Sequence, residues 1–242
     1  MIRFENVTKT YAGGATKAVD SLTMEIDGGK VFGFLGPNGA GKTTTIKLMT
    51  GILNPDSGRI TLENFDLEKN PIEAKRMFGF VPDSFEMFDR LTKMEYLTFL
   101  ADVYQVGQAE RKAHIDRMLP MFSLEKEVNQ QIRSYSHGMK QKLQVIGSLI
   151  HQPRIWILDE PMTGLDPASM HVLKQEMQRL CDDGRTVFFS THVLDVAERL
   201  CDEIGIIRKG TLIAQGAMDA LMKGDHSKTL EDLFLDLTSK EA

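Results

Sequence analysis

The fold follows from the stretch Gly36-Pro37-Asn38-Gly39-Ala40-Gly41-Lys42-Thr43-Thr44. It matches the pattern G-x-x-x-x-G-K-[ST]. An apolar run over 31–35 precedes it and predicts a buried parallel strand. A helical pattern over 43–49 follows it, with Gly51 as the expected C-terminal cap. Because a strand, a glycine-rich loop and a helix occur in that order, we predict a loop that binds phosphate groups.

The residue types in this loop suit a phosphate chain. Its glycines let several backbone N–H groups point at one anion, and the following helix adds its free N–H groups and its dipole. Lys42 supplies a mobile positive charge for the β and γ phosphates, and the Thr43 hydroxyl can ligate Mg²⁺. The alternative is an ordinary glycine turn with a solvated lysine. The motifs described next argue against that alternative.

Two further strand ends carry chemically active side chains. Asp159 and Glu160 follow the apolar strand 155–158, at the edge where ligands bind in parallel sheets. Asp159 is expected to hold Mg²⁺ through its water shell, and Glu160 to orient or deprotonate the attacking water. His192 follows the strand 186–190 and can donate a hydrogen bond to a γ-phosphate oxygen. The alternatives are a turn cap for the acidic pair and a structural role for the histidine.

Two other segments are candidates for nucleotide contact. Ser136-His137-Gly138-Met139 opens a helix with Ser136 as its N-cap, and Met139 provides no acidic side chain to complete a capping box. The free N–H groups there form a second anion site, or else the stretch is simply a capped helix. Tyr11 lies in a loop twenty-five residues before Gly36. It can stack on a nucleobase or pack on its own sheet, and the sequence favours neither.

Composition excludes several classes of function. The chain has 242 residues, a net charge of −5 and a pI near 5.7, which argues against nucleic acid as a partner. Its two cysteines, Cys181 and Cys201, lack metal-ligand spacing and fall in segments with a helical pattern, so we expect reduced core cysteines. No apolar run approaches the ~20 residues needed to span a bilayer. A signal peptide is also absent from the N-terminal residues, so we expect a cytoplasmic protein.

The order of elements predicts an α/β fold. Residues 1–83 and 151–217 alternate strands and helices and form the expected core, including an antiparallel β subdomain built from strands near 2–7 and 21–26 around a Gly13-Gly14 turn. Residues 84–150 have helical periodicity and no clear strand, which predicts an inserted α-helical subdomain. Residues 218–242 form a short tail with helical spacing of leucines.

Over roughly 2–217 the sequence resembles the nucleotide-binding subunits of ABC transporters, and every signature element of that family occurs in order. The resemblance implies a P-loop NTPase (RecA-like) core. It also implies roles for six sets of residues: Tyr11 stacks on the base, 36–44 hold the phosphates, Ser136 to Met139 form the signature, 155–160 form the metal strand with Glu160 as catalytic residue, Gly164-Leu165-Asp166 form the dimer-contact loop, and His192 is the switch histidine.

The resemblance further implies an assembly. Two copies of this chain, or this chain and a paralogous ATPase subunit, bind two ATP molecules with Mg²⁺ in a head-to-tail dimer. Each ATP lies between one phosphate loop and the Ser136 and Gly138 of the other subunit. ATP closes the dimer, hydrolysis opens it, and the motion drives a transmembrane permease on a separate chain. The protein is then peripheral on the inner face of the cell membrane, and the signature variant favours export.

Three positions in two segments depart from the family pattern. His137 and Met139 stand where the signature usually has glycine and glutamine, in the manner of subunits that serve compact (ABC-2-like) exporters. Asp83 stands where the family usually offers glutamine to the metal. A carboxylate can still ligate Mg²⁺, directly or through water, but with a shorter reach and an added charge.

An apolar loop suggests where the permease docks. Phe85, Met87 and Phe88 crowd together at the join between the core and the helical segment, where they either line a groove for a helix of the permease or pack under the insert.

Three other functions fit parts of the sequence but are disfavoured by other parts. A soluble ABC-type ATPase of DNA repair or of the ribosome is disfavoured by the single cassette and the absence of a coiled-coil arm. A regulator that binds ATP without hydrolysis is disfavoured by Glu160 and His192, and a GTPase by the lack of an Asn-Lys-x-Asp motif.

Overall fold

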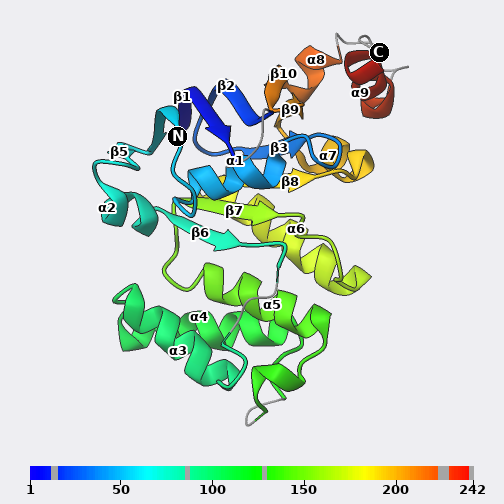
Figure 1. The fold of residues 1–242 in the computed structure, drawn as a ribbon. Helices are drawn as coiled ribbons and strands as arrows, with labels where there is room; N and C mark the ends of the chain where they lie inside the picture. Colours follow the sequence, from blue (N-terminus) through cyan, green and yellow to red (C-terminus); the bar gives the residue numbers. More distant parts are fainter. Residues whose placement is uncertain (12–15, 85–87, 127–129, 223–228, 240–242) are drawn as a thin grey trace.

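The computed structural model describes residues 1–11, 16–84, 88–126, 130–222 and 229–239, and its ten strands in these ranges form two sheets. The four-stranded sheet has the order β2-β1-β4-β5 and the six-stranded sheet the order β10-β9-β3-β8-β7-β6 (Figure 1). The first sheet contains β1 (Ile2–Thr10), β2 (Lys17–Ile26), β4 (Ser57–Leu62) and β5 (Phe65–Asp66). The second contains β3 (Val31–Leu35), β6 (Phe78–Val81), β7 (Ile155–Asp159), β8 (Thr186–Thr191), β9 (Glu203–Arg208) and β10 (Thr211–Ala217).

The helices of the described residues fall into three groups along the chain. The first group is α1 (Lys42–Met49) and α2 (Pro71–Arg76), and the second is α3 (Lys93–Val103), α4 (Gln108–Met121), the 3₁₀ helix η1 (Ile132–Ser134) and α5 (His137–Ser148). The third is α6 (Pro167–Asp182), α7 (Leu194–Leu200), α8 (Met218–Leu221) and α9 (Leu230–Ser239). Each helix among these is too short or too polar to span a bilayer.

The six-stranded sheet places the functional segments. Strands β9, β3, β8, β7 and β6 pair in parallel, and β10 pairs antiparallel with β9. In a parallel sheet all carboxyl ends lie at one edge. The loops after β3, β7 and β8, which carry the predicted phosphate, metal and histidine residues, therefore meet at that edge.

Two hydrophobic clusters hold the sheets and helices together. One contains Phe4 of β1, Phe32 of β3 and Ile46 of α1, so α1 packs between the two sheets. The other contains Trp156 of β7 and residues of the helical segment such as Leu143 of α5. The helical segment shares this cluster with the core, and in Figure 1 it lies at the end of the molecule away from β1 and β2. The domain boundaries at 84 and 150 stay predictions.

Most predicted elements occur, with shifts at their ends. The first strand continues to Thr10 and the second begins at Lys17, because the two pair through bulges as far as Thr10↔Lys17. The helix predicted to open after Ser136 runs from His137 to Ser148, and Cys201 follows α7 rather than lying within it. Thr92 caps α3 in a full capping box with Glu95. The predicted Gly13-Gly14 turn lies outside the described residues.

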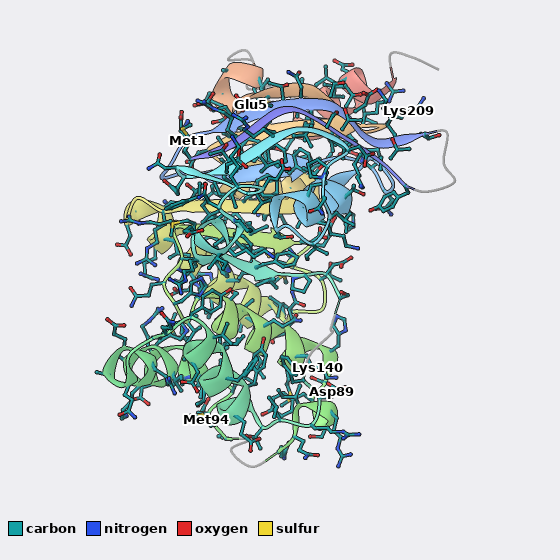
Figure 2. All side chains as sticks on the ribbon, turned by 60° about the vertical axis from the view of Figure 1, so that its left-hand side comes forward. Met1, Glu5, Asp89, Met94, Lys140 and Lys209 are labelled. Atoms are coloured by element: carbon teal, nitrogen blue, oxygen red, sulfur yellow. The ribbon has the colours of Figure 1, made fainter. Side chains whose placement is uncertain are left out.

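Polar contacts fix the surface of the helical segment. Lys140 of α5 donates a 2.8 Å hydrogen bond to Asp89, and Figure 2 shows these two side chains together. This pair joins α5 to the loop that leads into α3. It therefore helps to hold the start of α5, where the predicted signature lies.

Candidate functional site

The phosphate loop leaves β3 at the carboxyl edge of the sheet and enters α1. Gly41 has φ +111°, in the left-handed region that favours glycine. A Cβ atom at Gly36 would lie 2.5 Å from the carbonyl oxygen of Ile207 in β9. Both glycines are therefore required by the backbone itself, before any ligand is considered.

Lys42 is held against its own loop. Its ammonium group donates hydrogen bonds to the carbonyl oxygens of Gly36 (2.7 Å) and Pro37 (3.3 Å). The residue is 7% exposed, and burial lowers the pKa of its ammonium group, although Glu160 and Asp159 oppose that shift. Its Nζ lies 3.8 Å from Oε1 of Glu160. The lysine charge therefore faces both the loop and the acidic residue that follows β7.

Glu160 and His192 are in contact. The distance from His192 Nδ1 to Glu160 Oε2 is 3.0 Å, because β7 and β8 are neighbours that pair Asp159 with Ser190. Glu160 has φ +48°, a left-handed conformation that costs a non-glycine residue about 1–3 kcal/mol. The backbone thus aims the Glu160 carboxylate towards Lys42 and His192 at the expense of local stability.

Ser190 is a residue that the sequence analysis did not assign. Its hydroxyl donates a 2.6 Å hydrogen bond to Asp159 Oδ1 and accepts one of 3.1 Å from the backbone N–H of Glu160. It thus fixes the metal candidate and the catalytic candidate together. The sequence shows only a serine two residues before the histidine, at the end of a strand. That pattern does not identify Asp159 as the partner of the serine unless the pairing of the strands is known.

Asp159 is a buried carboxylate beside the phosphate loop. It is 2% exposed, and burial raises the pKa of its carboxyl group, while hydrogen bonds from Ser190 and Thr43 oppose that shift. A cation would compensate the cost of burying this charge.

The oxygen donors at this place fit Mg²⁺. A cavity of about 370 Å³ is lined by residues that include Lys42, Thr43, Asp83 and Glu160. Hydroxyl and carboxylate oxygens are the ligands that Mg²⁺ prefers. Among the described residues no three His, Cys, Asp or Glu side chains form a metal cluster. A Mg²⁺ site usually takes one or two protein ligands, with substrate phosphates and water as the others.

Tyr11 lies at the rim of the same cavity. Its hydroxyl is 3.2 Å from the Thr44 hydroxyl, and 47% of the residue is exposed. The ring is therefore next to the phosphate loop and has an open face. This placement is what base stacking requires.

The predicted signature and dimer-contact loop touch one another within one chain. Ser136 caps α5 by accepting a 3.3 Å hydrogen bond from the Met139 N–H. A Cβ at Gly138 would lie 2.9 Å from the Gly164 carbonyl oxygen, and one at Gly164 would lie 2.4 Å from the His137 ring.

Asp166 also links the predicted dimer-contact loop to α5, the helix that carries the predicted signature. It accepts a 3.0 Å hydrogen bond from the Ser169 N–H as the cap of α6 and lies 2.7 Å from Lys142 Nζ of α5. Lys142 and Ser169 hold the pKa of the Asp166 carboxyl group well below its usual range. This loop is therefore fastened to α5.

The structure does not bring the signature into the nucleotide cavity of its own chain. Neither Ser136 nor Gly138 lines the cavity that Lys42 and Thr43 line. His137 instead lines an adjoining cavity of about 220 Å³ that shares Asp83 and Glu160 with it.

The predicted docking loop is described only in part. Phe85 and Met87 lie outside the described residues. Phe88 is 55% exposed and makes an edge-to-face contact with Phe99 of α3, with ring centroids 5.1 Å apart. An aromatic pair is therefore present at the surface of the helical segment.

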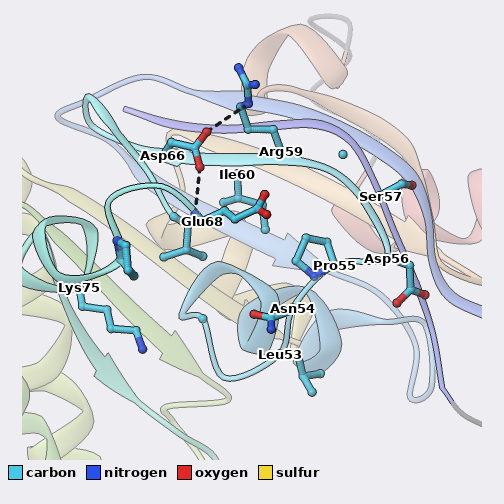
Figure 3. A pocket seen from close by; sticks show the side chains of 14 residues that line it. Leu53, Asn54, Pro55, Asp56, Ser57, Arg59, Ile60, Asp66, Glu68 and Lys75 are labelled. Atoms are coloured by element: carbon cyan, nitrogen blue, oxygen red, sulfur yellow. Dashed lines mark hydrogen bonds and ion pairs between the residues drawn. The ribbon is translucent and has the colours of Figure 1, made fainter.

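Another hollow lies away from all predicted site residues. It has a volume of about 500 Å³ between the end of α1, β4 and α2, and Arg59 pairs with Asp66 at 3.2 Å on its wall (Figure 3). The figure shows Lys75 of α2 on the opposite side. Its wall carries charges of both signs and none of the predicted nucleotide or metal residues. We therefore place the site at the phosphate loop.

The fold and the site together define a P-loop nucleoside triphosphatase. A family model described as ABC transporter matches residues 19–163. The chain therefore belongs to the ABC transporter family, as an ATP-binding subunit with ATPase activity. This confirms the predicted family and the P-loop NTPase fold.

The relatives include several ATP-binding subunits. The chain is 34% identical over 220 residues to the ABC transporter ATP-binding protein NatA of Bacillus subtilis (strain 168), covering 90% of this chain and 89% of that protein. It is 34% identical over 233 residues to the Nod factor export ATP-binding protein I of Paraburkholderia xenovorans (strain LB400), covering 96% of this chain and 76% of that protein.

Solved structures agree with these relatives. An ATP-binding subunit of an ABC transporter superposes with a TM-score of 0.93 at 31% identity, covering 98% of this chain and 99% of the other. A dimeric ATP-binding cassette in a post-hydrolysis state, bound to ADP and phosphate, superposes with a TM-score of 0.81 at 26% identity, covering 90% and 99%.

Proposed function

We propose that two copies of this chain, or this chain and a paralogous subunit, enclose two ATP molecules head to tail and drive a separate permease. One observation carries the proposal: Lys42, Glu160 and His192 meet at the phosphate loop, whereas Ser136 and Gly138 lie outside the cavity. The second wall of each nucleotide site must then come from another subunit. The dimeric relative with bound ADP and phosphate supports this arrangement.

Within one chain, each of these residues has a different role in ATP hydrolysis. Residues 36–44 bind the phosphate chain through backbone N–H groups, and Lys42 leaves the carbonyl oxygens of its loop to meet the β and γ phosphates. Glu160, held by His192, orients the attacking water and accepts its proton. His192 donates a hydrogen bond to a γ-phosphate oxygen as negative charge develops there. Tyr11 stacks on the base.

Thr43, Asp159 and Asp83 are the residues that would hold Mg²⁺. The bound ion would neutralise charge on the β and γ phosphates. The hydrogen bond from Ser190 orients Asp159 for this role. Asp83 lies between the nucleotide cavity and the cavity beside His137, so it also connects the site with the helical segment.

The partner subunit is contacted through the signature and the loop Gly164-Leu165-Asp166. The N-terminus of α5, with Ser136 and Gly138, binds the γ-phosphate held by the other subunit. Because Lys142 and Asp166 link the two segments, a movement of the signature is transmitted to the loop that follows Glu160.

The permease is expected at the exposed aromatic pair Phe88 and Phe99, next to the loop with Phe85 and Met87. An apolar helix of the permease fits such a surface. The subunit then works in the cytoplasm on the inner face of the membrane. Export is favoured because curated relatives are named for Nod factor export and for linearmycin resistance.

The test is Glu160→Gln, which keeps the size of the side chain and removes its basicity. We expect ATP hydrolysis to fall at least about 100-fold because general-base catalysis contributes about 10²–10⁴. We also expect ATP binding to persist and ATP-dependent dimers to accumulate in size-exclusion chromatography. Glu73→Gln, on an exposed turn of α2, is the matched control and should change neither measurement.

Two results would contradict the proposal. Near-normal turnover in Glu160→Gln would remove Glu160 from its role. Full-speed hydrolysis by wild-type protein that stays monomeric at all ATP concentrations would show that one chain holds a complete site.

A further inference from the structure

A second cluster of charged groups lies away from the nucleotide cavity. It surrounds a hollow of about 300 Å³ between α4 and α6, lined by three guanidinium groups and a histidine. Arg117 comes from α4, Arg179 from α6, and Arg185 from the residue before β8. The lining contains one carboxylate, Glu110.

Two of these guanidinium groups are held in place by a carboxylate behind them. Glu176 has only 3% of its side chain exposed and accepts hydrogen bonds from Arg117 at 2.7 and 3.3 Å and from Arg179 at 3.0 Å. Arg179 also binds Asp183 at 2.9 Å. These carboxylates orient Arg117 and Arg179 but do not line the hollow, so N–H groups of the two arginines remain for a ligand.

Arg185 lacks an ion pair within the described part of the chain. Its Nη2 donates a 3.3 Å hydrogen bond to the amide oxygen of Gln152, which is neutral. Burial lowers the pKa of its guanidinium group, and Arg179 and Arg154 lower it further while Asp183 opposes them. Arg185 is therefore a partly buried cation without a carboxylate partner in the described ranges, and an anion in the hollow would compensate its charge.

We propose that this hollow binds a phosphate group, supplied either by inorganic phosphate or by a small phosphate monoester. Guanidinium groups match the geometry of phosphate oxygens in bidentate hydrogen bonds. The hollow also has room for a small organic group beside the phosphate. Glu110 at the rim disfavours an anion that extends in its direction.

The site is separate from the nucleotide site. Arg185 stands at the amino end of β8 and Gln152 precedes β7, whereas His192 and Glu160 follow the carboxyl ends of the same two strands. A bound phosphate would join α4 to the start of β8, and so tie the helical segment to the core. We expect the bound phosphate to restrict movement of the helical segment relative to the core.

The experiment measures calorimetric binding of inorganic phosphate and of glycerol 3-phosphate to the full chain carrying Lys42→Ala, which weakens the phosphate loop. We expect saturable binding in this background. Adding Arg185→Gln should weaken it about tenfold or more, the range for a lost charge-assisted hydrogen bond. Adding Lys112→Gln, which removes one positive charge from α4 outside the hollow, should change it less than about twofold.

Further measurements identify the ligand and test whether loss of binding comes from misfolding. Tighter binding of glycerol 3-phosphate than of inorganic phosphate would assign the site to a monoester, and the reverse order to free phosphate. Gln152→Glu places a carboxylate beside Arg185 and should likewise weaken binding about tenfold or more in a folded chain. With Lys42 intact, Arg185→Gln should keep wild-type ATP hydrolysis, so the two sites are distinguished. Absence of saturable binding, or equal binding in the Arg185→Gln and Lys112→Gln chains, overturns the proposal.

Discussion

Ser190 shows how one buried hydroxyl can organise a catalytic edge. It connects the carboxylate of Asp159 with the backbone of Glu160, and it is fully buried. Removing it would leave a buried carboxylate with fewer donors and would free the left-handed backbone at Glu160.

We therefore expect Ser190→Ala to lower the free energy of unfolding by about 1–3 kcal/mol and to reduce ATP turnover. Urea denaturation and a steady-state ATPase assay measure the two effects. Ser148→Ala is the control, because Ser148 is a buried serine bonded to Trp156 and Val145, away from the site. It should reduce stability without a specific loss of turnover. Equal specific activity of the two folded variants would contradict the role of Ser190.

At the scale of single residues, the sequence predicts positions within one segment but not contacts that depend on which strands pair. The positions of Lys42, Asp159 and Glu160 could be predicted because each is adjacent in sequence to a recognisable strand or loop. The contact of Ser190 with Asp159 joins residues 31 apart and depends on which strands are neighbours. A sequence without that pairing shows only a serine before a threonine and a histidine.

At the scale of elements, the approach of α5 to β6 depends on a glycine. A Cβ at Gly79 would lie 2.0 Å from the carbonyl oxygen of Ser148, the last residue of α5. The apolar residues of 78–81 are typical of a buried strand, but the need for glycine at position 79 cannot be predicted from them, because it arises from a helix that is distant in the sequence.

We expect Gly79→Ala to destabilise the protein by about 1–3 kcal/mol or more, since backbone must move to admit the methyl group. Thermal and urea unfolding measure the change. Gly28→Ala is the matched control: its Cβ would have no neighbour closer than 3.9 Å, and stability should change by less than about 0.5 kcal/mol. Similar stabilities for the two variants would show that α5 does not press on β6 as the structure indicates.

At the scale of the whole molecule, His151 joins the helical segment to the core. Its ring stacks on Tyr104, which follows α3, with centroids 3.7 Å apart, and its Nε2 donates a 3.0 Å hydrogen bond to the Phe78 carbonyl of β6. Nδ1 is buried without a hydrogen-bond partner in the described ranges. Burial, with a smaller contribution from His114, lowers the pKa of this histidine from 6.5 to about 4, although the hydrogen bond to the Phe78 carbonyl opposes the shift.

This pKa shift predicts the pH dependence of unfolding. The unfolded chain binds a proton near pH 6.5 and the folded chain only near pH 4, so stability is full above pH 6.5 and falls as the pH drops between these values. The loss approaches roughly 3 kcal/mol by pH 4. Urea midpoints between pH 7.5 and 5 measure it.

His151→Gln is the variant for comparison, because its amide can still donate to the Phe78 carbonyl but does not titrate in this range. The variant should be less stable at pH 7 and less sensitive to acid than the wild type. A residual slope is expected from His114, a second histidine with a lowered pKa. Parallel pH profiles for the two proteins would rule out His151 as the source.

The backbone of Glu160 has a practical consequence for anyone who engineers this protein. A left-handed φ suits glycine better than glutamate, so the acid stands where a residue without a side chain would relax the loop. A screen that rewards heat resistance alone would favour that replacement. Such a screen would select a protein that is more stable to heat but no longer hydrolyses ATP.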